Sequence, residues 1–183
     1  MTAPATAATG TTTWTLDPSH SSIEFSAKHM MITTVRGRFA EASGTVSNVG
    51  TSPASAKVEV TLKAASIDTR TEQRDQHLRS ADFLDVEQYP DITFRSTKVE
   101  GTKERFTLTG DLTIRGTTKP LTLDVTFEGE GKDPWGGSRM GFSATGKIDR
   151  REFGLVWNQA LETGGVLVSN DIKLQIEAQF IRA

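Results

Sequence analysis

The chain has 183 residues, which is long enough for a single all-β domain with a buried core. It has no cysteine, so disulfides, thiol catalysis and cysteine metal ligands are excluded. Its 21 basic and 23 acidic residues give a net charge of -2 and form no basic stripe, which argues against nucleic-acid binding.

The first segment, residues 1–13, is rich in Ala and Thr and has neither the basic nor the apolar part of a secretory signal. We expect a disordered leader here, followed by one domain over residues 14–183. No later apolar run is long enough for a transmembrane helix, although transient contact with a membrane stays open. These features favour a cytoplasmic protein, with a periplasmic or secreted one as the alternative if a signal was removed from the N-terminus.

Alternation of apolar and polar residues, the pattern of a half-buried strand, recurs along the rest of the chain. The clearest segments are SSIEFSAKH (21–29), KVEVTL (57–62), RFTLTGDLTIR (105–115), PLTLDVTFEG (120–129) and DIKLQIEAQFI (171–181). Weaker ones lie at 35–46, 91–99 and 140–148, and RGTTKP (115–120) and EGEGKDPWGGS (128–138) are expected to be turns. The pattern predicts about eight antiparallel strands, and it fits a closed barrel and a two-sheet sandwich equally well.

The segment 69–84 departs from this period and predicts a short helix. Thr69 and Glu72 have the spacing of a capping box, so the helix is expected to begin there. Asp75 and Arg79, four residues apart, are expected to form an exposed ion pair. The opposite stripe is formed by Arg74, His77, Leu78, Ala81 and Leu84.

Arg74, His77 and His29 lie on inward faces, and two interpretations are open for them. Arg74 and His77 either tie the helix to the rest of the domain or meet a polar group of a ligand. His29, which ends the inward face of its strand, is either a rim histidine or a polar contact of a cavity. His20, after a proline in a turn, is expected to hold the entry of the chain by hydrogen bonds.

Motifs of catalysis and metal binding are absent. The three histidines have no metal-ligand spacing, and no nucleophile elbow, dinucleotide fingerprint or P-loop occurs, so neither a catalytic residue nor a metal ligand is assigned. A haem held by a histidine inside a barrel remains an alternative.

Five segments carry a resemblance to a known family: WTLDPSHSSIEFSAKH, VRGRFAEASGTV, SIDTRTEQRDQHLRSADFLDVEQYPDITFRST, LTGDLTIRGTTKPLTLDVTFEG and GFSATGKIDRREFGLVWN. With them the chain resembles the YceI-like family of lipocalin-like polyisoprenoid-binding proteins, and the resemblance spans residues 14–182. It implies an extended eight-stranded antiparallel barrel with a short helix, at about 69–84, against one end. It also implies an interior that holds a long apolar lipid, and often a homodimer.

The resemblance and the inward faces together give the expected binding residues. The polar positions that match the family's motifs are His20, Ser21, His29, Arg74, Asp75 and His77. The expected apolar lining is Ile23, Phe25, Val60, Leu62, Phe94, Leu108, Leu112, Phe127 and Phe142, with Leu78 and Phe83 closing one end.

The leading hypothesis is therefore a non-enzymatic protein that binds, transports or stores a long-chain isoprenoid lipid, such as a polyprenyl or isoprenoid quinone compound, and requires no cofactor. A binder of fatty-acid-type amphiphiles is one alternative. A haem, redox or enzymatic barrel that uses His29 and His77 is another, and a barrel with a packed interior is the third.

Overall fold

The computed structural model describes residues 12–50 and 52–182. Residues 1–11, most of the expected leader, lie outside the described residues, and Thr13 already belongs to the first strand. The strands are β1 (Thr13–Leu16), β2 (Ser22–His29), β3 (Thr33–Phe39), β4 (Ala42–Ser47), β5 (Lys57–Lys63), β6 (Ile67–Asp68), β7 (Asp91–Gly101), β8 (Arg105–Ile114), β9 (Thr117–Lys132), β10 (Ser138–Asp149) and β11 (Asp171–Arg182). The α-helix is α1 (Glu72–Arg79), and the 3-10 helices are η1 (Pro18–His20), η2 (Pro53–Ser55), η3 (Ala64–Ser66) and η4 (Arg150–Phe153).

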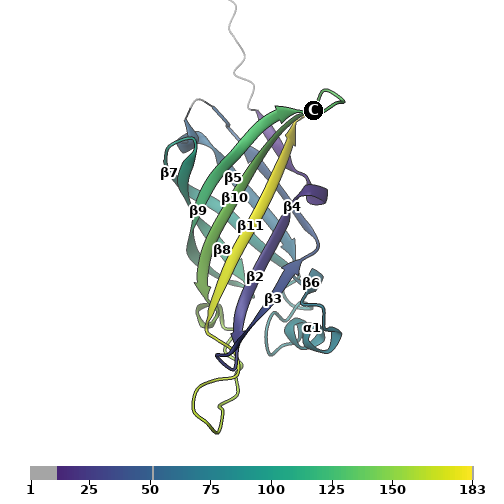
Figure 1. Ribbon diagram of the computed structural model, residues 1–183, viewed down its shortest axis with the longest axis vertical. Helices are drawn as coiled ribbons and strands as arrows, with labels where there is room; N and C mark the ends of the chain where they lie inside the picture. The colour runs from purple at the N-terminus through teal and green to yellow at the C-terminus, as the bar shows by residue number, and fades with distance from the viewer. Residues whose placement is uncertain (1–11, 51, 183) are drawn as a thin grey trace, which may run out of the picture.

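All strands belong to one antiparallel sheet that closes on itself. Its order is β1-β4-β5-β7-β8-β9-β10-β11, and β1 then pairs with β11 through Leu16 and Phe180. The remaining strands continue this ring: β2 pairs with the other half of β11, β3 pairs with β2, and β6 pairs with β3. The result is a closed eight-stranded barrel in which three of the eight positions are broken into two short strands (Figure 1). The closed barrel is thus confirmed over the sandwich.

The breaks have local causes. Between β1 and β2, Pro18 enters η1 and Asp17 caps it, because its Oδ1 accepts a hydrogen bond from the Ser19 N–H at 3.0 Å. Between β3 and β4 the chain leaves the ladder at Ala40 and Glu41. The weak strand expected at 35–46 is therefore two strands, and β1 and β6 are short strands that the alternation did not predict.

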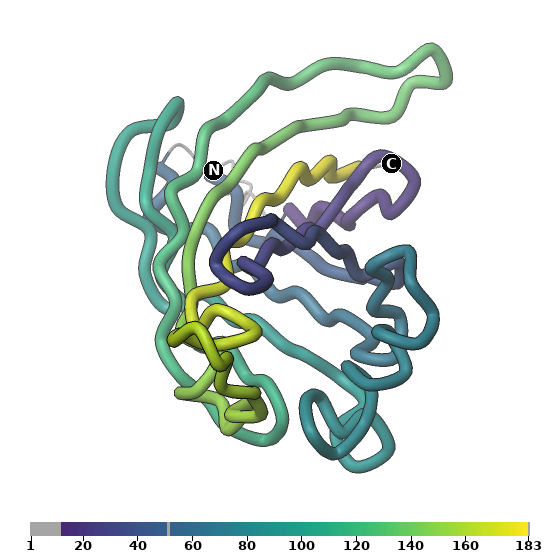
Figure 2. Tube along the Cα trace, turned by 60° about the horizontal axis from the view of Figure 1, so that its bottom comes forward, coloured from purple at the N-terminus to yellow at the C-terminus, as the bar shows by residue number. Residues whose placement is uncertain are grey.

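The two ends of the barrel differ. One, which we call the helix end, carries α1, the turn between β2 and β3 and the long loop 154–170 (Figures 1 and 2). The other, which we call the terminal end, carries the β9–β10 turn and the end of β11 (Figure 1). The turns expected at 115–120 and 128–138 are shorter than predicted, because β9 pairs from Thr117 with Ile114 and continues to Lys132 opposite Ser138.

The helix is also shorter than expected, and two details of its prediction are wrong. It begins at Glu72 after Thr71, without a side-chain cap, so the capping box at Thr69 does not form. It ends at Arg79 because Ser80 is extended, and the following residues up to Pro90 form turns. None of the described helices is long and apolar enough to cross a membrane.

Candidate functional site

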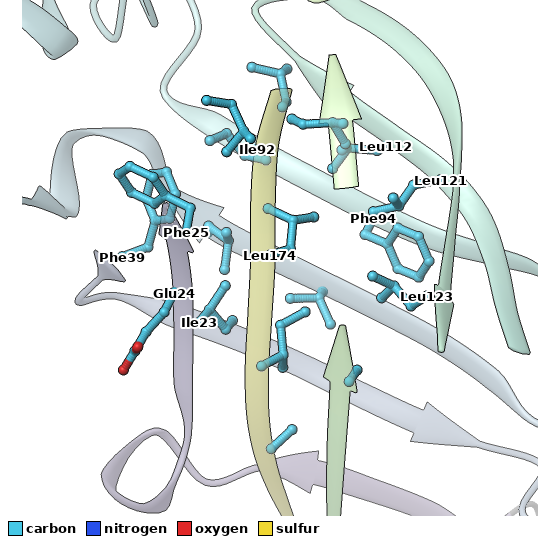
Figure 3. Close-up of a pocket in the computed structure, with 18 of the residues that line it drawn as sticks. Ile23, Glu24, Phe25, Phe39, Ile92, Phe94, Leu112, Leu121, Leu123 and Leu174 are labelled. Carbon is cyan, nitrogen blue, oxygen red and sulfur yellow. The ribbon is translucent and has the colours of Figure 1, made fainter. Parts of the chain in front are cut away.

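The barrel encloses a cavity of about 1150 Å³ that extends from the helix end to the terminal end. Its wall between the two ends is made of the inward aliphatic and aromatic side chains of the strands, because alternate residues of each strand point inward. Figure 3 shows side chains from several strands, such as Ile92, Phe94 and Leu174, directed into one space, while the carboxylate of Glu24 turns away from it. This volume is slightly above the range of about 300–1,000 Å³ typical of small-molecule pockets.

The predicted apolar residues all line this cavity. They are Ile23, Phe25, Val60, Leu62, Leu78, Phe83, Phe94, Leu108, Leu112, Phe127 and Phe142. The inward face that alternation assigned to each strand is the face that borders the cavity.

Two glycines make room for aromatic rings of the wall. A Cβ on Gly37 of β3 would overlap the ring of Phe25, and a Cβ on Gly110 of β8 would overlap the ring of Phe94. Each ring therefore packs over a glycine of the neighbouring strand, at a position where a side chain would collide with it.

The terminal end of the cavity is lined by phenylalanines and a few charged groups. The ring of Phe142 packs against those of Phe127 and Phe180, with centroids 5.4 and 6.0 Å away. Lys103 places its Nζ 5.3 Å from the centre of the Phe127 ring, and Glu130 also borders the cavity. Lys103 and Glu130 are exposed, so the cavity reaches the surface here.

At the helix end, three rings from three segments pack together. His77 of α1 lies edge-on against Phe83 and Trp157, at centroid distances of 5.1 and 4.6 Å. The His77 Nε2 is 2.8 Å from Asp82 Oδ2. The imidazole therefore contacts aromatic rings on one side and a carboxylate on the other. His77 thus holds the helix in place, which is the first of its two interpretations, and it borders the cavity. Its contact with a polar group of a ligand stays a prediction.

Arg74 likewise serves the local structure while bordering the cavity. Its Nε donates to Thr69 Oγ1 at 2.7 Å and its Nη2 donates to the Thr69 carbonyl at 2.8 Å. Asp75, expected on the exposed face, is instead only 4% exposed and does not border the cavity. It accepts hydrogen bonds from the Thr69 N–H at 2.9 Å and from Thr69 Oγ1 at 2.5 Å. The expected Asp75–Arg79 pair is therefore wrong, and Arg79 pairs with Glu72.

Arg150 is a buried residue of this end that the sequence did not reveal. It is 4% exposed, borders the cavity, and donates through Nη1 to the carbonyls of Leu155 at 2.7 Å and Trp157 at 2.8 Å. Its Nε donates to the Ser169 carbonyl at 2.9 Å, and burial lowers the pKa of its guanidinium. Arg150 lies in the run KIDRREF between two other charged residues, so the sequence pattern gives no indication that its side chain is buried.

His29 also borders the cavity at this end, and its backbone forms a bridge with Val168. Other polar residues that border the cavity there are Lys28, Thr69, Thr71 and Gln73. Gln73 is exposed, so the cavity reaches the surface at the helix end too. The polar groups are therefore gathered at the two ends of an apolar interior.

His20 and Ser21 do not border the cavity, contrary to expectation. Both bind Asp17: His20 Nδ1 lies 2.8 Å from Asp17 Oδ2, and Ser21 Oγ donates to the Asp17 carbonyl at 2.7 Å. Arg139 donates to the same Oδ2 at 2.7 Å. Hydrogen bonds from His20, Arg139 and Ser19 lower the pKa of Asp17 to about 2, against the effect of burial. These residues hold the chain entry together, which is the role expected for His20.

Within residues 12–50 and 52–182, no group of three His, Asp or Glu side chains lies close enough to hold a metal ion.

A closed antiparallel barrel around one apolar cavity is the architecture of lipocalin-like binding proteins. The chain belongs to the YceI-like family, since the sequence model of the YceI-like domain matches residues 14–180. A UPF0312 protein of Staphylococcus aureus (strain USA300) is 40% identical over 170 residues, covering 92% of this chain and 97% of that protein.

Solved structures have the same fold. The crystal structure of a YceI protein of Campylobacter jejuni is 36% identical and superposes with a TM-score of 0.74, covering 85% of this chain and 90% of that one. Burkholderia cenocepacia BcnA, 22% identical, covers 90% of this chain and 98% of its own with a TM-score of 0.76. A domain from Saccharophagus degradans, described as polyisoprenoid-binding, is 14% identical with a TM-score of 0.64, covering 91% of this chain and 97% of its own. The last two likenesses concern the fold alone.

Proposed function

We propose that this protein binds a long-chain isoprenoid lipid inside its barrel, without catalysis, to transport or store it. The observation that carries this proposal is the apolar cavity of about 1150 Å³ with polar side chains at its two ends. Membership of the YceI-like family supports it, as does the likeness in fold to a domain described as polyisoprenoid-binding.

The energetics of such a site favour a long apolar tail. Each Å² of apolar surface removed from water contributes about 25 cal/mol, so a tail that loses about 400 Å² gains on the order of 10 kcal/mol before the costs of association. Few hydrogen bonds are needed for affinity. The polar groups at the ends, such as Arg74 and His29, would instead fix the orientation of the ligand and select its head group.

A fatty-acid-type amphiphile is the second candidate, because the cationic side chains of Arg74 and Arg150 at the helix end suit a carboxylate. A haem held by His29 and His77 has less support. The His77 ring is packed between Phe83 and Trp157 with its Nε2 beside Asp82, so ligation of iron through this atom would break the contact.

An uptake assay on cavity variants tests the proposal. Leu108 borders the cavity and is 7% exposed, so Leu108→Asp places a charge on the wall and should reduce uptake of a prenyl quinone at least tenfold. Ala144→Trp fills part of the cavity without adding charge and should also reduce uptake, with more loss for longer tails. Lys57→Asp changes an exposed residue of β5 and is the control.

Circular dichroism should show the same barrel in each variant. Equal uptake by the Ala144→Trp and Lys57→Asp proteins would contradict binding inside the barrel. A shift of the Soret band of haem that is lost with His29→Ala would favour the haem alternative instead.

A further inference from the structure

The turn between β2 and β3 exposes three consecutive apolar side chains at the helix end. Met30, Met31 and Ile32 are 41%, 61% and 74% exposed. Isolated exposed apolar residues are common on protein surfaces, but a run of three at the tip of a hairpin is a feature that usually marks an interaction.

The backbone of this turn is one that methionine disfavours. Met30 and Met31 have φ angles of 52° and 60°, and the N–H of Ile32 donates to the His29 carbonyl at 3.0 Å. Hairpin turns with two such residues favour Asn-Gly, because a side chain beyond Asn is strained there. The two methionines therefore do not serve the turn, and their exposure shows that they do not serve the core either.

The turn stands beside an entrance to the cavity. Lys28 and His29, immediately before it, and Val35, shortly after it, border the cavity. Beyond the turn, β3 pairs with β6 only through Arg38 and Phe39, so its outer edge from Thr33 to Gly37 has no strand partner in the described part of the chain.

Side chains of α1 line the cavity on the other side of this unpaired edge. Gln73 and Arg74 are among them, and Gln73 is exposed, as is Lys28 on the β2 side. In the view of the helix end, the β2–β3 turn projects forward and α1 lies to its side (Figure 2). The lining and the unpaired edge together place an opening between β3 and α1, next to the apolar tip.

The flank of the hairpin is basic. Register places Glu24 opposite Arg38, Ser26 opposite Arg36, and Lys28 opposite Thr34 on the outward face of the two strands. Three basic side chains thus share this face with one carboxylate, and Arg38 also pairs with Asp68 of β6 at 3.3 Å. An apolar tip with a basic flank matches the apolar interior and anionic head groups of a lipid surface.

We propose that the turn Met30–Ile32 inserts into an anionic lipid surface and that the cavity exchanges its ligand there, through the opening between β3 and α1. This inference rests on the proposed function, since a carrier of a membrane lipid must load from and deliver to a membrane. A convex tip of three residues suits a fluid lipid surface better than a protein partner, which needs a larger complementary area.

Binding to vesicles and transfer of a prenyl quinone between vesicles test the proposal. The vesicles contain phosphatidylcholine with or without phosphatidylglycerol. The first variant combines Met31→Asp and Ile32→Asp. The second combines Met30→Asn and Met31→Gly, which suits the turn and so protects folding while removing two of the three apolar side chains of the tip. The control is Trp135→Asp, which changes an 87% exposed aromatic residue on the β9–β10 turn at the opposite end.

The wild type should bind the vesicles that contain phosphatidylglycerol more tightly than the others, and added salt should weaken this binding. Both tip variants should lower vesicle binding and the rate of transfer by about tenfold or more, and Trp135→Asp should leave both unchanged. Uptake of the quinone from detergent micelles should be the same in all four proteins.

Three results would overturn the proposal: tip variants that bind vesicles like the wild type, loss of binding with Trp135→Asp, or tip variants that only dissociate a dimer in sedimentation equilibrium. The last result would assign the tip to contact with a second copy. Absence of uptake from micelles by the wild type would contradict the proposed function, whereas vesicle binding that depends on the tip would still support the lipid contact.

Discussion

At the scale of single residues, several buried polar side chains hold separate segments of the chain together beside the apolar interior. Asp17 is the clearest case, because it is 8% exposed and its carboxylate receives hydrogen bonds from Ser19, His20 and Arg139. Arg139 also pairs with Asp133 at 3.0 Å, so this cluster joins the entry of the chain to the β9–β10 turn. Alternation of residues along strands cannot show such a cluster, because Arg139 of β10 is far in the sequence from Asp17, Ser19 and His20.

This cluster predicts a specific dependence of stability on pH. The pKa of Asp17 is lowered to about 2 from an ordinary 3.8, so its stabilisation is complete above about pH 4 and is lost as the pH falls toward 2. We expect Asp17→Asn to lower the free energy of unfolding by about 2 kcal/mol at pH 6 and by much less at pH 2. Urea titrations at several pH values measure both.

Asp124→Asn, which changes an exposed carboxylate on the outer face of β9, is the control and should change stability by less than about 0.5 kcal/mol. A difference between wild type and Asp17→Asn that stays constant from pH 6 to pH 2 would show that the carboxylate is not held in its charged form.

At the scale of elements, α1 is attached to the barrel by several polar contacts, among them one buried carboxylate and the hydrogen bonds from Arg79 to the carbonyls of Ala65 and Ile67. Asp75 accepts hydrogen bonds from the backbone and side chain of Thr69, and Arg74 binds the same Thr69 from the other side. The helix has only eight residues, too few to be stable alone in water, so these contacts fix it against the entrance of the cavity.

A pair of substitutions in the helix tests this attachment. Asp75→Ala leaves the buried Thr69 N–H without an acceptor and should lower the free energy of unfolding by about 2 kcal/mol. Glu72→Ala removes a carboxylate of the same helix whose side chain is 71% exposed and should cost about 0.5 kcal/mol or less. Equal effects in a denaturant titration would contradict the role of Asp75.

The elements also show which parts of the fold can be predicted from the sequence. Alternation located the long strands, and it assigned Leu108, Leu112 and the other lining residues to the inward face. It missed β1, because only four residues precede the break at Asp17, and it extended the helix too far because Ala81 and Leu84 continue its apolar spacing. The i, i+4 spacing of Asp75 and Arg79 suggested a surface pair, since no sequence rule shows that Thr69 folds back over the carboxylate.

At the scale of the whole molecule, closure of the sheet distinguishes this protein from a sandwich with the same residue pattern. Closure depends on the pairing of Leu16 with Phe180, residues near the two ends of the chain, and local patterns carry no information on it. Local patterns also do not show the packing of Phe25 over Gly37 and of Phe94 over Gly110, because each contact joins two neighbouring strands. The resemblance to the YceI-like family predicted the closed barrel, and the match of residues 14–180 to the YceI-like model confirms the family.

The central claim is that the cavity of about 1150 Å³ holds a lipid. Native mass spectrometry of gently purified protein tests it most directly, by comparing the intact mass with that of the denatured chain. The account predicts an additional mass that is released on denaturation and is identified as a long-chain isoprenoid lipid. A native mass equal to that of the bare chain, with no gain after incubation with prenols or prenyl quinones, would contradict it.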